Sequence, residues 1–153
     1  CSSDLLEVTE KEQLKEILDS CKVCRLGIYG EPPYIVPMNF GYTWTDGLTL
    51  YFHSAPKGRK IDLLKERPKV SFEMDCDHRL VTGATACRYT YRYASLYGEG
   101  NVRFIEAYDE KLAALKTIMA RVTGTDDYQY EEAAVKSVQV FAVEASGVSG
   151  KKR

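Results

Sequence analysis

The sequence has no long apolar run and almost no net charge. Its 153 residues carry 21 basic and 22 acidic side chains, which leaves a formal net charge of -1. A chain with balanced charge has no general attraction for nucleic acid or for anionic membranes, so any anion site must be local. No apolar stretch approaches the roughly 20 residues that a membrane-spanning helix needs. We therefore expect a soluble protein that binds neither nucleic acid nor membrane.

The sequence also lacks the even set of cysteines that a disulfide-bonded secreted domain would carry. Its five cysteines are scattered through segments with helix or strand patterns: Cys1, Cys21, Cys24, Cys76 and Cys87. Free thiols suit a reducing compartment, and we expect the cytoplasm. The opening tripeptide CSS would also fit the mature end of a lipoprotein, and a trimmed start is the alternative explanation.

A zinc site is the metal site that the sequence best suggests. Cys21, Cys24, Cys76 and His78 are ligand types that zinc accepts, and the Cys21-x-x-Cys24 spacing suits it. Cys21, however, closes an amphipathic helix pattern, where cysteine behaves as a small apolar residue. The chain also lacks the βαβ context of a thioredoxin-type redox pair. We expect no metal site.

Hydrophobic periodicity predicts three helices and six strands. Helical spacing covers residues 10–20, 60–66 and 109–123, the first with a Thr9–Glu12 capping box and the last ending near Gly124. Extended patterns cover residues 23–29, 34–44, 48–54, 69–76, 93–106 and 138–146, with a polar loop at 77–90. These elements are typical of an α+β protein that is mainly β.

Turn residues indicate how the strands are arranged. Pro37 has no N–H for a sheet ladder, so its strand should lie at an edge or a bulge. Asp46-Gly47 predicts a hairpin turn, and Gly98 and Gly100 should let their long strand bend or bulge. No repeat or linker divides the chain, so we expect one domain over residues 1–153, a six-stranded antiparallel β-barrel with flanking helices.

The stretch 51–64, YFHSAPKGRKIDLL, predicts an anion site where a strand becomes a helix. A helix N-terminus offers unpaired N–H groups and the positive end of its dipole, and Gly58 allows close approach. Arg59 and Lys60 add cations at the end of the helix where cations are unfavourable unless an anion compensates. His53 and Ser54 add an imidazole and a hydroxyl. The alternative is a solvated basic loop.

A flat heteroaromatic ligand would suit the neighbouring strand. Asn39 lies between Met38 and Phe40, so an amide is flanked by apolar side chains. Met38 and Phe40 would equally well be ordinary barrel core.

The stretches that carry these features resemble a known family. Residues 33–75, the strand with a serine before a bent Gly-x-Gly (YRYASLYGEGNVRFIE) and the helix EKLAALKTIMARVTG are similar to FMN-binding split β-barrel proteins related to pyridoxamine phosphate oxidase. Within that family they look like the branch associated with nitroimidazole resistance. The resemblance covers about residues 10–145, and "FHSA…GRK" is its most specific part. It implies a homodimer with FMN in a groove shared by the two barrels.

The resemblance also implies a role for particular residues. Met38, Asn39 and Phe40, together with Pro37, would run along the isoalloxazine, largely through main-chain groups. His53 and Ser54 would contact the ribityl or phosphate region, with Ala55 allowing close approach. Arg59 and Lys60 would hold the phosphate, and Ser95 is a further candidate on a neighbouring strand. The better-known oxidases use an arginine near the position of Pro37 to grip pyridoxal, which argues against that reaction here.

The function we expect is electron transfer from a reduced flavin to a small electrophile such as a nitroaromatic compound. The flavin would carry the redox chemistry. His53 is the candidate catalytic residue, for proton delivery, and a plain hydrogen bond to the cofactor is its alternative role. A carrier or sensor that holds flavin or haem without efficient turnover is the alternative function, with His53 or His78 as haem ligand.

The tyrosine-rich stretch 88–93, RYTYRY, mixes bases and aromatics as a nucleic-acid surface would. The balanced charge and the strand periodicity favour a barrel or dimer surface instead.

Overall fold

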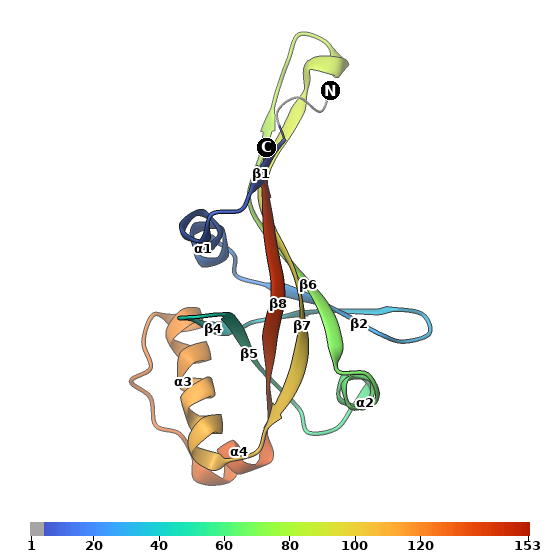
Figure 1. Ribbon diagram of the computed structural model, residues 1–153. Coiled ribbons are helices and arrows are strands. Elements are labelled where there is room, and N and C mark those ends of the chain that lie inside the picture. Colours follow the sequence, from blue (N-terminus) through green and yellow to red (C-terminus); the bar gives the residue numbers. More distant parts are fainter. Residues whose placement is uncertain (1–4) are drawn as a thin grey trace.

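Eight antiparallel strands form one curled sheet in the computed structural model, which describes residues 5–153 (Figure 1). The strands are β1 (Leu6–Val8), β2 (Cys24–Ile28), β3 (Tyr34–Met38), β4 (Gly41–Trp44), β5 (Leu48–Ser54), β6 (Lys69–Val81), β7 (Thr90–Ile105) and β8 (Gln139–Lys152). Their order in the sheet is β3-β2-β6-β7-β8-β5-β4, and β1 pairs with β8. The mainly β fold that the sequence predicts is confirmed.

Four helices accompany the sheet: α1 (Lys11–Ser20), α2 (Arg59–Glu66), α3 (Tyr108–Thr123) and α4 (Glu132–Ser137). Figure 1 shows α1 beside the upper half of the long strands, α3 and α4 along one lower side, and α2 at the other. No described helix is long and apolar enough to cross a membrane.

Alternation along the strands sends one set of side chains into a common core. Phe52 on β5 stacks on Phe141 of β8 with ring centroids 5.3 Å apart, and Phe104 of β7 lies 6.1 Å from the same ring. Phe52, Phe72 and Phe141 are fully buried. A second, smaller cluster around Val140 and Ala142 packs the outer side of β8 against α3.

An arginine of α3 connects the helices to the barrel. Arg121 places its guanidinium 4.3 Å from the ring centroid of Phe40 and donates hydrogen bonds to the carbonyls of Leu18 and Cys21 at the end of α1. The Leu18 carbonyl also accepts the N–H of the C-cap residue Cys21 at 3.1 Å, and the arginine adds a side-chain donor at this helix end while it covers the barrel.

The turn residues act as the sequence predicts. β3 is the edge strand that Pro37 requires, the Asp46-Gly47 turn joins β4 to β5, and α3 ends at Gly124 with φ 90°. The pairing of β7 with β8 shifts register between Glu99 and Gly100, which is the predicted bulge.

Four local expectations are wrong. No side chain caps α1, whose N-cap residue is Glu10, so the Thr9 capping box does not form. The stretch 34–44 is two strands, broken at Asn39 and Phe40, and the short β1 adds another, so eight strands replace six. Residues 132–137 form a helix, α4, that the sequence analysis missed.

The fourth difference is the predicted loop 77–90, whose first part, residues 77–81, continues strand β6, so that the connection is shorter and covers residues 82–89. Pairing resumes at Arg79 after a register shift that follows Cys76. Asp77 adopts a φ of 57° there, a left-handed conformation that aspartate tolerates better than most residues. The hairpin therefore projects beyond the barrel, past α1 (Figure 1).

We expect Gly98→Ala to destabilise the protein by about 1–3 kcal/mol, the cost typical of overpacking a dense core. A Cβ at this position would lie 2.2 Å from the Phe72 ring, which is fully buried and has no space to move. Gly47→Ala is the control, because no atom lies within 4 Å of its added Cβ. Urea unfolding of the two variants measures the difference, and equal midpoints would contradict close packing at Gly98.

Candidate functional site

The junction between β5 and α2 presents the backbone groups of an anion site. Gly58 is the N-cap residue of α2, with φ 143°, and no side chain caps the helix. The N–H groups of Arg59, Lys60 and Ile61 therefore have no intrahelical acceptor, whereas the N–H of Asp62 donates to the carbonyl of Gly58 at 3.1 Å. Asp62 also lies in this turn and offsets part of its positive charge.

The two cations of this turn have different surroundings. Arg59 is exposed and lies over the ring of Tyr34 at the start of β3, 4.5 Å from the ring centroid. Lys60 is partly buried, and burial lowers the pKa of its ammonium group. A partly desolvated ammonium group gains more from a bound anion than an exposed one does. Tyr34, which the sequence analysis missed, joins β3 to the site.

His53 points away from the barrel interior, because the preceding residue Phe52 points into it. Its side chain lines a hollow of about 390 Å³ between β5, α3 and α4. The other lining residues are Leu115, Ile118, Met119, Gln129, Tyr130, Glu131, Ala134, Val135 and Val138. The hydroxyl of Tyr130 is buried and has no hydrogen-bond partner among the described residues.

The pKa of His53 lies below its ordinary value of 6.5, first because of burial and second because of the positive charge of Lys60. The shift favours the neutral imidazole, which can donate one hydrogen bond and accept another.

Ser54 and Ala55 connect His53 to the segment that leads into the first turn of α2. The Ser54 hydroxyl donates a 3.0 Å hydrogen bond to the carbonyl of Ala55, and Ala55 itself is exposed. His53, Ser54, Ala55, Arg59 and Lys60 thus lie on one continuous stretch at one end of the molecule.

The β3 residues divide between the core and the outer face. Met38 and Phe40 are buried members of the barrel core, whereas Pro37 and Asn39 are exposed. The Asn39 side-chain amide donates to the carbonyl of Lys22 at 3.3 Å. Met38 and Phe40 can therefore offer a ligand only their main-chain groups, while Pro37 presents its ring.

Ser95 lies far from the other site residues of the same chain. It pairs with Lys151 of β8, whereas Ser54 pairs with Gln139 of that strand. The intervening length of β8 is roughly 40 Å at the usual rise per residue. Within one chain, Ser95 is not part of the β5–α2 site.

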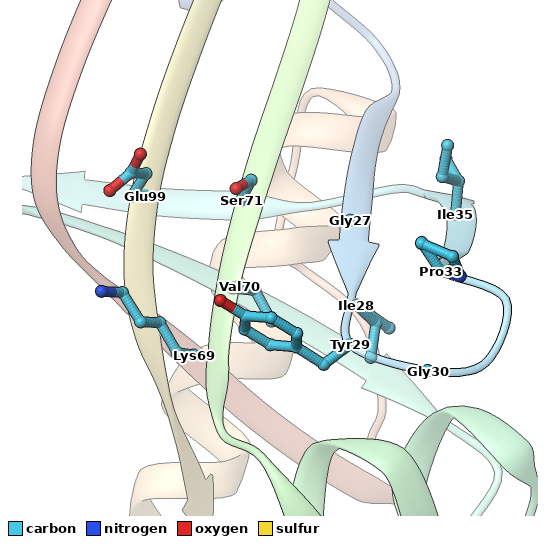
Figure 2. A pocket seen from close by; sticks show the side chains of 10 residues that line it. All are labelled: Gly27, Ile28, Tyr29, Gly30, Pro33, Ile35, Lys69, Val70, Ser71 and Glu99. Carbon is cyan, nitrogen blue, oxygen red and sulfur yellow. The ribbon is translucent and has the colours of Figure 1, made fainter.

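A second hollow, of about 460 Å³, lies on the outer face of β2, β3, β6 and β7 (Figure 2). Figure 2 shows Lys69, Ser71 and Glu99 on one side of it, with Pro33 and Ile35 on the other. Ile35 and Pro37 share the exposed face of β3, so this hollow adjoins the β3 surface that the sequence associates with a flat ligand.

An ion-pair cluster occupies the same outer face further along β6. Arg25 donates to Glu73 at 3.2 Å and to Asp75 at 2.9 Å, and His78 contacts Asp75 at 2.6 Å. Burial, followed by a hydrogen bond to Asp75, raises the pKa of Glu73 to about 7. Neither the cluster nor this carboxyl pair was anticipated from the sequence.

The cysteine pattern does not form a metal centre among residues 5–153. No group of three potential ligands from His, Cys, Asp and Glu lies close enough there to hold a metal ion. Cys21, Cys24 and Cys76 are buried free thiols and Cys87 is an exposed one. Cys1 lies outside the described residues.

The family model for pyridoxamine 5'-phosphate oxidase matches residues 10–152. The chain belongs to the pyridoxamine 5'-phosphate oxidase family. A candidate 5-nitroimidazole antibiotic resistance protein from Bacteroides thetaiotaomicron is 36% identical, covers 97% of this chain and 87% of its own, and has a TM-score of 0.85. The protein is thus a nitroimidazole-resistance-type member of the pyridoxamine 5'-phosphate oxidase family, as its sequence motifs suggested.

Two more distant structures share the fold of this family member. The flavocytochrome Anf3 from Azotobacter vinelandii is 20% identical with a TM-score of 0.80, over 97% of this chain and 69% of its own. The FAD and haem binding protein from Mycobacterium smegmatis is 18% identical with a TM-score of 0.82, over 95% and 72%. No curated protein matches the sequence significantly.

The lowered pKa of His53 predicts a specific pH dependence. The folded state binds a proton at His53 less readily than the unfolded state, so this residue's contribution to the free energy of unfolding falls as the pH drops below about 6.5. Lys60→Gln removes one cause of the shift and should raise the pKa of His53. NMR titration of the two histidines measures it, with His78→Gln to assign the signals; an unchanged pKa in Lys60→Gln would contradict the interaction.

Proposed function

We propose that the protein is an FMN-dependent oxidoreductase that passes electrons from reduced flavin to a small electrophile such as a nitroaromatic compound. The observation that carries the proposal is the β5–α2 junction, where Arg59, Lys60 and the uncapped N–H groups of α2 converge. A dianionic phosphate suits this arrangement, because it accepts charge-assisted hydrogen bonds and offsets the helix dipole. The placement of the cations at the first turn is otherwise unfavourable.

The residues present fit a flavin phosphate with its ring on β3. Arg59 stacks on Tyr34, so the first turn of α2 lies next to the start of β3. Pro37 lies three residues along the same strand, roughly 10 Å away, with its ring exposed. Main-chain groups of this edge strand are free on one side for hydrogen bonds to a flat ring, since β3 has a neighbour on one edge only among the described strands.

A homodimer would complete the site. Ser95 is separated from the β5–α2 junction by roughly 40 Å of strand within its own chain. In a two-fold dimer with antiparallel barrels, the outer face of β7 from one chain would lie over the β5–α2 end of the other. Each of the two sites would then contain residues of both chains, including Ser95 of the second copy.

Flavin, when bound, supplies the chemistry of electron storage and transfer. The protein binds the phosphate through Arg59 and Lys60 and orients the ring along β3. His53 lies on β5 beside the hollow lined by α3 and α4, where its imidazole would hold or move a proton. The similarity to the Bacteroides protein favours a nitroimidazole-type substrate.

We place this activity in a reducing compartment such as the cytoplasm. Cys21, Cys24 and Cys76 are buried as free thiols, and burial raises the pKa of Cys24 to about 12. Buried protonated thiols are unreactive and behave as core residues.

Arg59→Ala combined with Lys60→Ala should abolish flavin retention, because it removes both charged donors to the phosphate. The matched control is Lys57→Ala with Lys65→Ala, which removes the same charge just before the turn and at the far end of α2. The measurement is the absorption spectrum of freshly purified protein with mass analysis of the released cofactor. Retention of flavin by the first variant would contradict phosphate binding by Arg59 and Lys60. A haem spectrum in the wild type would contradict the assignment of flavin as the cofactor.

His53→Gln should lower turnover of a nitroaromatic substrate more than it lowers FMN affinity. Glutamine keeps hydrogen-bonding groups at this position but cannot carry a proton near neutral pH. Steady-state kinetics and a flavin titration give the two quantities. Equal losses in both would mean that His53 only contacts the cofactor.

A further inference from the structure

The hollow beside His53 is enclosed by one strand and two helices. β5 contributes His53, α3 contributes three side chains, and α4 with the segments on either side of it contributes the others. Figure 1 shows the connection from α3 running back alongside that helix to α4. The volume of about 390 Å³ lies within the range of about 300–1,000 Å³ that is usual for small-molecule sites.

Most of the wall of this hollow is apolar. The apolar side chains that line it are Leu115, Ile118, Met119, Ala134, Val135 and Val138. Among the described residues that line it, Glu131 is the only acid and no lysine or arginine is present, and Glu131 is exposed. Displacement of water from such a wall favours the binding of an apolar molecule, whereas an anion would find no lysine or arginine there.

Two polar side chains of the wall lack a hydrogen-bond partner. The imidazole of His53 is exposed and forms no hydrogen bond with another described residue. The hydroxyl of Tyr130 is buried and also has no partner in the described part of the chain. Burial, followed by the negative charge of Asp126, raises the pKa of Tyr130, so its hydroxyl stays protonated and can donate. A buried donor that stays unpaired costs about 1–3 kcal/mol.

Tyr130 is placed where it can respond to a ligand. Its ring is part of the wall, so rotation about the side-chain bonds would turn the hydroxyl towards a molecule in the hollow. The residue precedes α4 and lies outside the regular helices and strands, so this rotation breaks no backbone ladder. The ammonium group of Lys116 on α3 lies 5.9 Å from the ring centroid, on the side chain's route along that helix.

We propose that this hollow is a binding site for a small, uncharged, mainly apolar molecule that carries a hydrogen-bond acceptor. The acceptor takes a hydrogen bond from Tyr130, His53 lies beside it, and the side chains of α3 and α4 enclose the apolar part. The inference goes beyond the proposed function, because it requires no flavin. None of the lining residues belongs to α2 or β3, and His53 is the residue that the two sites would share.

NMR of the histidine rings tests the site directly, because the chain contains two histidines and one of them lines the hollow. The probe is acetophenone, an uncharged aromatic ketone, added to the protein with its own cofactor at pH 8. It should shift the ring-proton signals of His53 saturably and leave those of His78, on the β6–β7 hairpin, unchanged. A His53 signal that does not respond would overturn the site.

Tyr130→Phe tests the hydrogen bond, and it removes a hydroxyl that has no partner to lose. The variant should raise the dissociation constant of acetophenone about fivefold, as expected for the loss of one hydrogen bond. Cumene, which has an isopropyl group in place of the acetyl group, is the control ligand, and its dissociation constant should not rise. An equal rise for both ligands, or for neither, would overturn the role of Tyr130.

Filling the hollow tests its location. Ala134→Phe places a large ring on α4 at a lining position and should abolish the saturable shift of His53. Ala133→Phe is the matched control, because Ala133 is equally exposed on the same helix but does not line the hollow. Unchanged acetophenone binding by Ala134→Phe would overturn the inference.

The outcomes separate this site from the proposed function. A flavin-bound protein whose His53 signals ignore acetophenone would overturn the site and leave the function standing. A colourless protein that ignores added FMN but shows the His53 shift, its loss in Ala134→Phe and the selective effect of Tyr130→Phe would overturn the function and support the site.

Discussion

The packing of inward side chains from both ends of one curled sheet into a common core is the constraint on which the rest of the structure depends. Phe52 and Phe141 stack there at 5.3 Å, and Phe72 fills the space that Gly98 leaves open. Because side chains alternate along a strand, every residue that points into this core sends its neighbours outward. The outward positions of His53 and Pro37 follow directly from the burial of Phe52 and Met38.

Curling also creates the candidate site, because it brings opposite regions of the sheet together. β3 begins the strand order and β5 is next to its end, yet Arg59, just after β5, stacks on Tyr34 of β3. The cations, the uncapped helix and the exposed edge strand converge only in the folded chain. Burial in this setting lowers the pKa values of both Lys60 and His53, because it disfavours their charged forms.

The β6–β7 hairpin extends beyond the barrel at the end of the molecule away from α2 and α4. Leu80, Tyr89 and Tyr91 are exposed there, and Arg79 and Arg92 are direct cross-strand partners.

The sequence by itself determined the features that depend on local backbone chemistry. Gly124 ends α3 in a left-handed conformation, Asp46-Gly47 turns the β4–β5 hairpin, Pro37 marks an edge strand and the stretch around Gly58 predicts an anion site. Glycine, proline and aspartate act through their own dihedral preferences, and these need no distant partner.

Tertiary structure decided the rest. Residues 77–81 are strand because β6 continues to pair with β7 across a bulge, and α1 begins at Lys11, after β1 has paired with β8 up to Val8. Tyr34 contacts Arg59 and Tyr130 lines the hollow beside His53, although both are distant in the sequence, and local sequence patterns do not predict such contacts. Long-range pairing outweighs propensity in these places, because a continuous ladder satisfies the backbone groups that a loop would leave to water.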